Sequence, residues 1–292
     1  MAPQAGLAAA ALIVNALVWG LSWWPFRHLD GLGLHPLWAT TVVYALSSAV
    51  LLAWRPRSLL ELLRPSPLWV LVLAAGTTNA AFNWAVSIGD VVRVVLLFYL
   101  MPLWAVLLAR VLLDEPITRQ ALLRVALGLL GAAVVLWPEG GAGQLSAAFS
   151  LADGLAILGG FSFALNNIML RRERHRSEGA RAAAMFIGGA LVAAVVGWML
   201  SRTGSVALPG PWGFDAPWWP LALLLALAFL VANLSLQYGA SRLPASRSAV
   251  IMLMEVPFAA ISAVLLGAGT LTPLLLIGAG CILASAWLSA FD

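Results

Sequence analysis

Carboxamide side chains recur at matched places in two apolar segments of this 292-residue chain. Asn79 and Asn83 are four residues apart in the first segment, and Asn233 and Gln237 repeat that spacing in the second. Because residues four apart share one face of a helix, each pair predicts two hydrogen-bonding groups one turn apart on the same side. Such groups either bind a polar solute or join neighbouring helices, and for each residue alone the second interpretation is at least as good.

A single carboxyl group, that of Glu255, lies in an apolar stretch two residues before Pro257. An ionisable side chain at membrane depth is costly and is by default a functional candidate. Glu255 could bind the ammonium group of a substrate, exchange protons, or hydrogen-bond the backbone beside the proline. The sequence leaves these three roles open.

Two prolines occupy corresponding places in apolar segments, Pro102 in one and Pro257 in the other. Proline has no backbone donor, so within a helix the carbonyl four residues earlier, that of Phe98 or Leu253, loses its usual partner. In lipid such a carbonyl must be satisfied by protein or water, so the pair favours a polar cavity beside both prolines. The alternative for either proline alone is a tolerated packing kink.

The composition places these residues in a membrane protein, because 62% of the chain is hydrophobic and only 10% is charged. Soluble domains carry about 25% charged residues. A helix needs about 20 residues to cross about 30 Å of hydrocarbon. We therefore predict an all-α membrane protein with ten transmembrane helices, at residues 7–26, 37–54, 68–87, 91–113, 120–137, 151–170, 182–200, 218–239, 247–266 and 273–291.

All of the basic residues are arginine, and their positions predict the orientation of the chain. Cytoplasmic loops are enriched in Lys and Arg, whereas translocated loops are depleted. If both termini are cytoplasmic, only Arg27, Arg93 and Arg202 of the 16 arginines lie on the outer side. The alternation holds at every predicted loop, so it supports ten crossings with both termini in the cytoplasm.

The polar residues of the two halves of the chain correspond at a constant shift of 154 positions, which pairs Asn79 with Asn233 and Asn83 with Gln237. This match predicts two repeats, 1–138 and 139–292, that form one integrated transport domain. With five helices each, the repeats enter the membrane from opposite sides and are therefore inverted. Inverted repeats can enclose a cavity that opens to either side, as in secondary transporters. The alternative is a duplicated scaffold that transports nothing.

The residues predicted to bind substrate or line its cavity share polar or aromatic side chains at these depths: Trp19, Asn79, Phe82, Asn83, Phe98, Tyr99, Phe163, Asn166, Asn233, Gln237, Tyr238 and Glu255. A second set is predicted to kink a helix or to gate the path: Arg93, Met101, Pro102, Trp104, Arg247 and Pro257. For Arg93 and Arg247 the alternative to a gate is snorkelling of the side chain to the lipid head groups.

Enzymatic and nucleic-acid functions find no support in the sequence. The three histidines all fall in predicted loops, and the chain has neither an H-E-x-x-H motif nor a glycine-rich phosphate loop with its lysine. We expect no catalytic residues, metal site or cofactor, and no nucleic-acid partner.

No basic residue falls in the middle of a predicted segment, which argues against strongly anionic substrates. Asp114 and Glu115, near two arginines, fit either a solvated charge cluster or an inner gate.

Three short motifs carry a resemblance to a known family: Trp19-Gly20-Leu21-Ser22, Leu112-Leu113-Asp114-Glu115-Pro116-Ile117-Thr118 and Glu255-Val256-Pro257-Phe258. They resemble the drug/metabolite transporter superfamily and, within it, the EamA-type exporters, closest to those that export amino acids. The second half lacks an acid corresponding to Glu115 at residues 267–272, which places any symmetric role of that acid in doubt.

The resemblance implies an exporter of metabolites in the bacterial inner membrane that works by alternating access. The third, fourth, eighth and ninth helices would line and gate the path. The implied substrates are amino acids, aromatic ones included, and related small metabolites. The implied partners are this solute and membrane lipid, and whether protons are a third partner stays open. The alternative is efflux of lipophilic organic cations.

Overall fold

The computed structural model describes residues 2–63, 67–88, 94, 97–135, 149–209, 216–266 and 273–290, and these form helices and turns without a strand. The helices are α1 (Ala2–Leu21), α2 (Trp23–Gly31), α3 (Pro36–Trp54), α4 (Arg57–Leu63), α5 (Leu68–Ile88), α7 (Met101–Leu112), α8 (Arg119–Val135), α9 (Leu151–Arg172), α10 (Glu178–Arg202), α11 (Trp219–Ala240), α12 (Ala245–Met252), α13 (Glu255–Leu265) and α14 (Pro273–Ala290).

A helix occupies the place of each of the ten predicted segments. Five stretches are long and apolar enough to cross a membrane, namely Gln4–Gly31, Pro36–Trp54, Leu151–Arg172, Glu178–Arg202 and Trp219–Ala240. Shorter apolar helices lie at Met101–Leu112, Val250–Ala259 and Leu276–Ser285. The chain is therefore a multi-pass, all-helical membrane protein, while the total of ten crossings stays a prediction.

Side chains fix the starts of several helices by accepting hydrogen bonds from backbone N–H groups that have no helical partner. Ser150 and Asp153 form a reciprocal capping box at α9, with distances of 3.2 and 2.7 Å. At α3, His35 Nδ1 accepts from the Leu37 amide at 3.2 Å. Burial lowers the pKa of His35, an effect that Asp30 partly offsets, and so favours the neutral ring that this cap requires.

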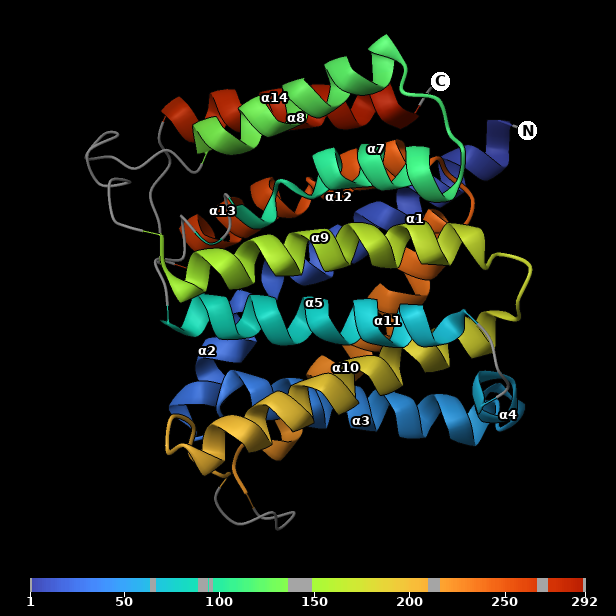
Figure 1. Cartoon of the computed structure of the whole chain (residues 1–292). Coiled ribbons are helices and arrows are strands. Elements are labelled where there is room, and N and C mark those ends of the chain that lie inside the picture. Colours follow the sequence, from blue (N-terminus) through green and yellow to red (C-terminus); the bar gives the residue numbers. More distant parts are fainter. Residues whose placement is uncertain are drawn as a thin grey trace.

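The helices form a layered bundle, with α8 and α14 at one edge and α3 and α10 at the opposite edge (Figure 1). Helices from before residue 135 pack mainly on helices from after residue 151. Thus α5 packs on α9 and α10, α3 on α10 and α11, α7 on α9, α8 on α14, and α1 on α11 and α13. The two ends of the chain lie at the same end of the bundle in Figure 1.

Both helices that contain the paired prolines are interrupted. A turn at Tyr99 and Leu100 precedes α7, and a turn at residues 253–254 separates α12 from α13. Pro102 and Pro257 consequently lie in the first turn of a new helix, where a missing N–H costs little. This corrects the prediction of prolines in mid-helix.

The prediction of an unpaired carbonyl at Leu253 is also corrected. This carbonyl accepts a hydrogen bond from the Val256 amide at 3.0 Å. The turn therefore satisfies a backbone group that an unbroken helix with an internal proline would have left open.

Each interruption is covered by a glycine from a helix of the other half of the chain. Gly160 of α9 lies against the carbonyl of Phe98, so closely that a Cβ would clash with it. Gly20 of α1 lies on α13, where a Cβ would come within 2.8 Å of the Glu255 carbonyl and 2.7 Å of Phe258 Cβ. The absence of a side chain at both positions lets the helices approach the broken segments.

Candidate functional site: a central cavity and a second pocket

A small cavity lies where α1, α5, α9, α13 and the segment before α7 meet. It is lined by Trp19, Thr78, Asn79, Phe82, Phe98, Phe163 and Glu255. About 20 Å³ of it is open to water. One water molecule needs about 10–15 Å³ by this measure. The cavity therefore has room for about one water molecule and none for a metabolite in this form.

Aromatic rings form most of the cavity wall. Phe98 lies at its centre, with ring centroids 4.7 Å from Phe82 and 5.9 Å from Phe163. Trp19 packs edge-on against Phe229 of α11 at 4.5 Å. The buried Trp19 Nε1 has no hydrogen-bond partner in the described part of the chain, so it is an available donor at the wall.

Glu255 supplies the carboxyl group of this cavity from the first residue of α13. The hydroxyl of Tyr99, in the turn before α7, donates a hydrogen bond to it. The two interrupted helices thus meet through this pair. No basic side chain is among the lining residues, so the cavity presents one acid among aromatic rings.

The two matched asparagines, Asn79 and Asn233, converge on a residue that the sequence did not single out. The hydroxyl of Tyr44 on α3 donates to Asn79 Oδ1 at 3.1 Å and accepts from Asn233 Nδ2 at 3.4 Å. Both amides also donate to the backbone four residues earlier, at 2.8 Å. Tyr44 therefore bridges α5 and α11 inside the bundle, next to the cavity that Asn79 lines.

Asn83, one turn after Asn79, does not line the cavity. It is buried, and its amide donates a short hydrogen bond to the hydroxyl of Thr40 on α3. Thr40 and Tyr44 lie one turn apart, so two carboxamides of α5 find their partners on one face of α3. This contact was not predicted from the sequence, although the equal spacing of Thr40 and Tyr44 and of Asn79 and Asn83 was a signal that could have predicted it.

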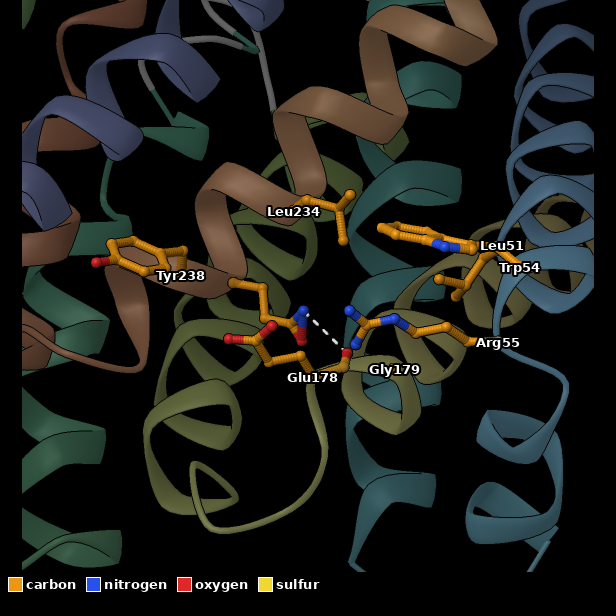
Figure 2. Close-up of a pocket in the computed structure, with 8 residues that line it drawn as sticks. Leu51, Trp54, Arg55, Glu178, Gly179, Leu234 and Tyr238 are labelled. Carbon is orange, nitrogen blue, oxygen red and sulfur yellow. Dashed lines mark hydrogen bonds between the residues drawn. The ribbon is translucent and has the colours of Figure 1, made fainter.

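Gln237 and Tyr238 lie in a different place, a pocket of about 230 Å³ between α3, α10 and α11 (Figure 2). Its lining residues are Leu51, Trp54, Arg55, Glu178, Gly179, Leu234, Gln237 and Tyr238. Gln237 Nε2 donates to the backbone carbonyl of Glu178 at 3.0 Å. The structure thus places residues that were predicted for one site in two separate cavities, and others in neither.

The remaining predicted residues lie around these cavities. Asn166 is buried in α9, and its Oδ1 is unpartnered among the described residues. Trp104 packs edge-on against Phe161 of α9 at 5.8 Å, and Met101 is fully buried in the core. Arg247 lies partly buried near the start of α12. Arg93 lies outside the described residues.

One ion pair joins the two halves of the chain at a bundle end. Arg171, next to the last residue of α9, contacts Glu115 with 2.6 Å between Nε and Oε1. Asp114 before it adopts a φ of 54°, which reverses the chain and lets the Glu115 amide reach the Ala109 carbonyl at 3.2 Å. The ion pair shows that Glu115 is not freely solvated, because it is tied to α9.

Among the residues that the structure describes, no group of three or more His, Cys, Asp or Glu side chains could hold a metal ion.

A bundle of membrane helices, two of them interrupted beside a buried cavity with one carboxyl group, is the architecture of a membrane transport protein. Comparison with known families gives the same class: the model of the EamA-like transporter family matches residues 6–137 and 150–291. The chain belongs to this family, whose members are small-molecule transporters rather than enzymes.

A solved crystal structure has the same fold, with a TM-score of 0.76 over 96% of this chain and 95% of the other. At 18% sequence identity, this likeness concerns the fold alone. No curated protein matches the sequence.

Proposed function

We propose that the protein exports amino acids, aromatic ones included, and related small metabolites across the bacterial inner membrane by alternating access. Family membership establishes a membrane transporter of small molecules. The observation that carries the finer proposal is the chemistry of the central cavity, which is lined by Glu255, by aromatic rings and by Trp19, whose Nε1 has no hydrogen-bond partner among the described residues.

An amino acid presents an ammonium and a carboxylate on one carbon, and the cavity offers a partner of each kind. The Glu255 carboxyl suits the ammonium, and the Trp19 indole N–H can donate to the carboxylate. Phe82, Phe98 and Phe163 form an apolar wall for the side chain, and aromatic rings prefer such edge and offset contacts with each other. The closed cavity must widen to admit a substrate, which requires α1, α5, α9 and α13 to separate.

Several observations support alternating access between two inverted repeats. The family model matches each half of the chain, and each half supplies a glycine that covers the helix interruption of the other. The packing is reciprocal, since α5 lies on α9 as α11 lies on α1, and α7 lies on α9 as α13 lies on α1. The arginine distribution favours ten crossings with both termini cytoplasmic.

The choice of amino acids among small metabolites rests on the resemblance of the chain to the amino-acid exporters of the drug/metabolite transporter superfamily. The cavity permits this choice, and the resemblance selects it.

Glu255→Gln tests this assignment, because it keeps the shape of the side chain but removes the negative charge that would receive the ammonium. In proteoliposomes loaded with tritiated phenylalanine, we expect flux to fall at least about tenfold, the scale of a lost charge-assisted hydrogen bond. Asp30→Asn is the matched control, since Asp30 is an exposed carboxylate on α2 outside the cavity, and it should leave flux unchanged. Equal flux in both variants would remove Glu255 from the site.

A second candidate is efflux of lipophilic organic cations, which the lone acid and the absence of a basic lining residue also favour. Competition separates the two: if organic cations block phenylalanine flux and other amino acids do not, the cation function replaces the proposed one. A pH gradient across the same vesicles tests the proton role of Glu255. Faster phenylalanine flux with the gradient than without it would assign proton exchange to Glu255. Equal flux in both conditions would assign substrate binding alone.

A further inference from the structure

We propose that the pocket between α3, α10 and α11 is a second binding site for a zwitterionic amino acid, which holds the substrate at the predicted cytoplasmic end before it enters the central cavity. This inference rests on the proposed function, since it takes the same class of solute. The pocket is separate from the central cavity, because the two share no lining residue.

The first observation is an unsatisfied amide oxygen. Gln237 is only 2% exposed, and its Nε2 is already bonded to the Glu178 carbonyl. Its Oε1 is buried without a donor among the described residues. Buried acceptors almost always find a donor, so this oxygen can accept from a water molecule or from a ligand N–H that displaces it. An ammonium group supplies one and also suits the Glu178 carboxylate, which is half exposed and 3.6 Å from Arg242.

The second observation is a cation at the same pocket. Arg55 packs its guanidinium over the Trp54 ring, 4.9 Å from the ring centroid. No carboxylate of the described residues forms an ion pair with it. Figure 2 shows the Arg55 side chain extending from α3 toward Glu178 and Gly179. A guanidinium in this position can bind a carboxylate through two parallel hydrogen bonds.

The start of α10 adds a further partner for the carboxylate of the ligand. Glu178 and Gly179 form its first turn, where backbone N–H groups and the helix dipole favour a negative group. Gly179 is packed against both neighbours, since a Cβ there would clash with Ser58 Oγ of α4 and would lie 3.4 Å from Arg55 Cδ, so Arg55 lies directly against the start of α10. Together, Arg55 and the side chains of Glu178 and Gln237 supply the pocket with a partner for each of the two charges of an amino acid.

The size and walls of the pocket set the class of ligand. Its volume of about 230 Å³ is smaller than the roughly 300–1,000 Å³ of pockets for drug-sized ligands, which suits a single amino acid. Leu51, Trp54 and Leu234 form the apolar wall against which its side chain would pack. A bulkier lipophilic cation would leave Arg55 without a partner.

The pocket also connects to the central cavity through one helix. Gln237 lies one turn after Asn233 on α11, and Asn233 bonds Tyr44, which bonds Asn79 at the edge of the central cavity. The Tyr44 bridge therefore links the helix that carries Gln237 to the wall of the central cavity.

Arg55→Gln tests the second site, and Arg57→Gln is the matched control. Arg57 is exposed on α4 and loses the same charge, but it does not line the pocket. Initial rates of tritiated phenylalanine uptake are measured in inside-out proteoliposomes, whose outer face is the predicted cytoplasmic one. We expect Arg55→Gln to raise KM about tenfold at unchanged maximal rate, the scale of a lost charge-assisted hydrogen bond. Arg57→Gln should behave as the unsubstituted protein.

Competitors identify the ligand chemistry. Against the unsubstituted protein, phenylalanine should compete better than phenethylamine or 3-phenylpropionate, each of which lacks one charge. Against the Arg55→Gln variant, phenylalanine should no longer compete better than phenethylamine. Equal KM values for Arg55→Gln and Arg57→Gln would overturn the second site while leaving export intact, whereas no phenylalanine flux in the unsubstituted protein would overturn the proposed function itself.

A lipid phosphate is the competing occupant of this pocket, and vesicle composition distinguishes it. If the KM difference between the two variants appears only when anionic phosphatidylglycerol is present and vanishes in pure phosphatidylcholine, Arg55 binds a head group and the amino-acid site is rejected. A difference that persists in pure phosphatidylcholine supports the amino-acid site.

Discussion

Tyr44 is the side chain through which the matched asparagines of the two halves meet. It is almost completely buried, and its ring lies 6.1 Å from Phe186 and 5.9 Å from Phe229, measured between centroids. Its hydroxyl is both donor and acceptor, so Asn79 and Asn233 can use it at the same time. One phenol group thus joins α3, α5 and α11 between the two cavities.

Tyr44→Phe should destabilise the protein, because it leaves the buried Asn79 Oδ1 without its donor. Loss of a partner for a buried polar group costs about 1–3 kcal/mol. Denaturant unfolding in detergent should show a decrease of that size in the free energy of unfolding. Tyr238→Phe is the control, since the Tyr238 hydroxyl makes no hydrogen bond among the described residues. If both variants unfold alike, Tyr44 does not act as a bridge.

At this scale the sequence predicted which residues are polar and inward-facing but not how they are shared between sites. Repetition of the Asn79 and Asn83 spacing at Asn233 and Gln237 suggested one common ring. In the structure Asn83 bonds Thr40, and Gln237 faces the second pocket. Spacing along a helix fixes which side chains share a face, whereas the neighbouring helix decides what that face meets.

At the scale of elements, the interrupted helices and the glycines that cover them are the features that position Glu255. Turns before α7 and α13 place Tyr99 and Glu255 within hydrogen-bonding distance. Gly20 and Gly160 bring α1 and α9 against these turns. Interrupted helices at membrane depth are tolerated where protein or a water-filled cavity satisfies the backbone.

Gly20→Ala and Gly160→Ala should each push a helix away from its turn, because the added Cβ overlaps the backbone of the facing segment. Overpacking of this kind costs about 1–3 kcal/mol. We expect both variants to show lower thermal stability and slower phenylalanine flux. Gly6→Ala adds the same methyl group to α1 where no atom lies within 4 Å, and it should be neutral or slightly stabilising. Similar melting temperatures for all three variants would contradict the close packing at the turns.

Much of the element scale follows from the sequence. Apolar runs between arginine and glycine clusters placed a helix at every predicted segment, because burial in lipid demands such runs. The prolines marked the two interruptions, but the sequence placed them inside continuous helices. The missing backbone N–H of a proline indicates where a regular helix is disturbed. Local turns, such as that at Leu253, then decide which backbone carbonyls accept a hydrogen bond from another amide.

At the scale of the whole molecule, the two halves of the chain are interleaved rather than side by side. Helices of one half pack mainly on those of the other, and Glu115 and Arg171 join the halves again at one end of the bundle. Movement of one half against the other would therefore rearrange both cavities and break this ion pair. Sequence matching predicted the two halves, but it could not predict the cross-half contact of Glu115, because the second half has no corresponding acid.

The central claim is that transport requires the halves to separate at this end, and cross-linking tests it directly. Glu115→Cys and Arg171→Cys are combined in a Cys281→Ser background and joined by a short, reducible bis-thiol linker in proteoliposomes. A pair on α10 alone, Trp198→Cys with Arg202→Cys, is the control, since it spans one turn of a single helix. We predict that the cross-link between residues 115 and 171 abolishes phenylalanine flux, that reduction restores it, and that the control cross-link has no effect. Full flux through the protein cross-linked between residues 115 and 171 would contradict the account.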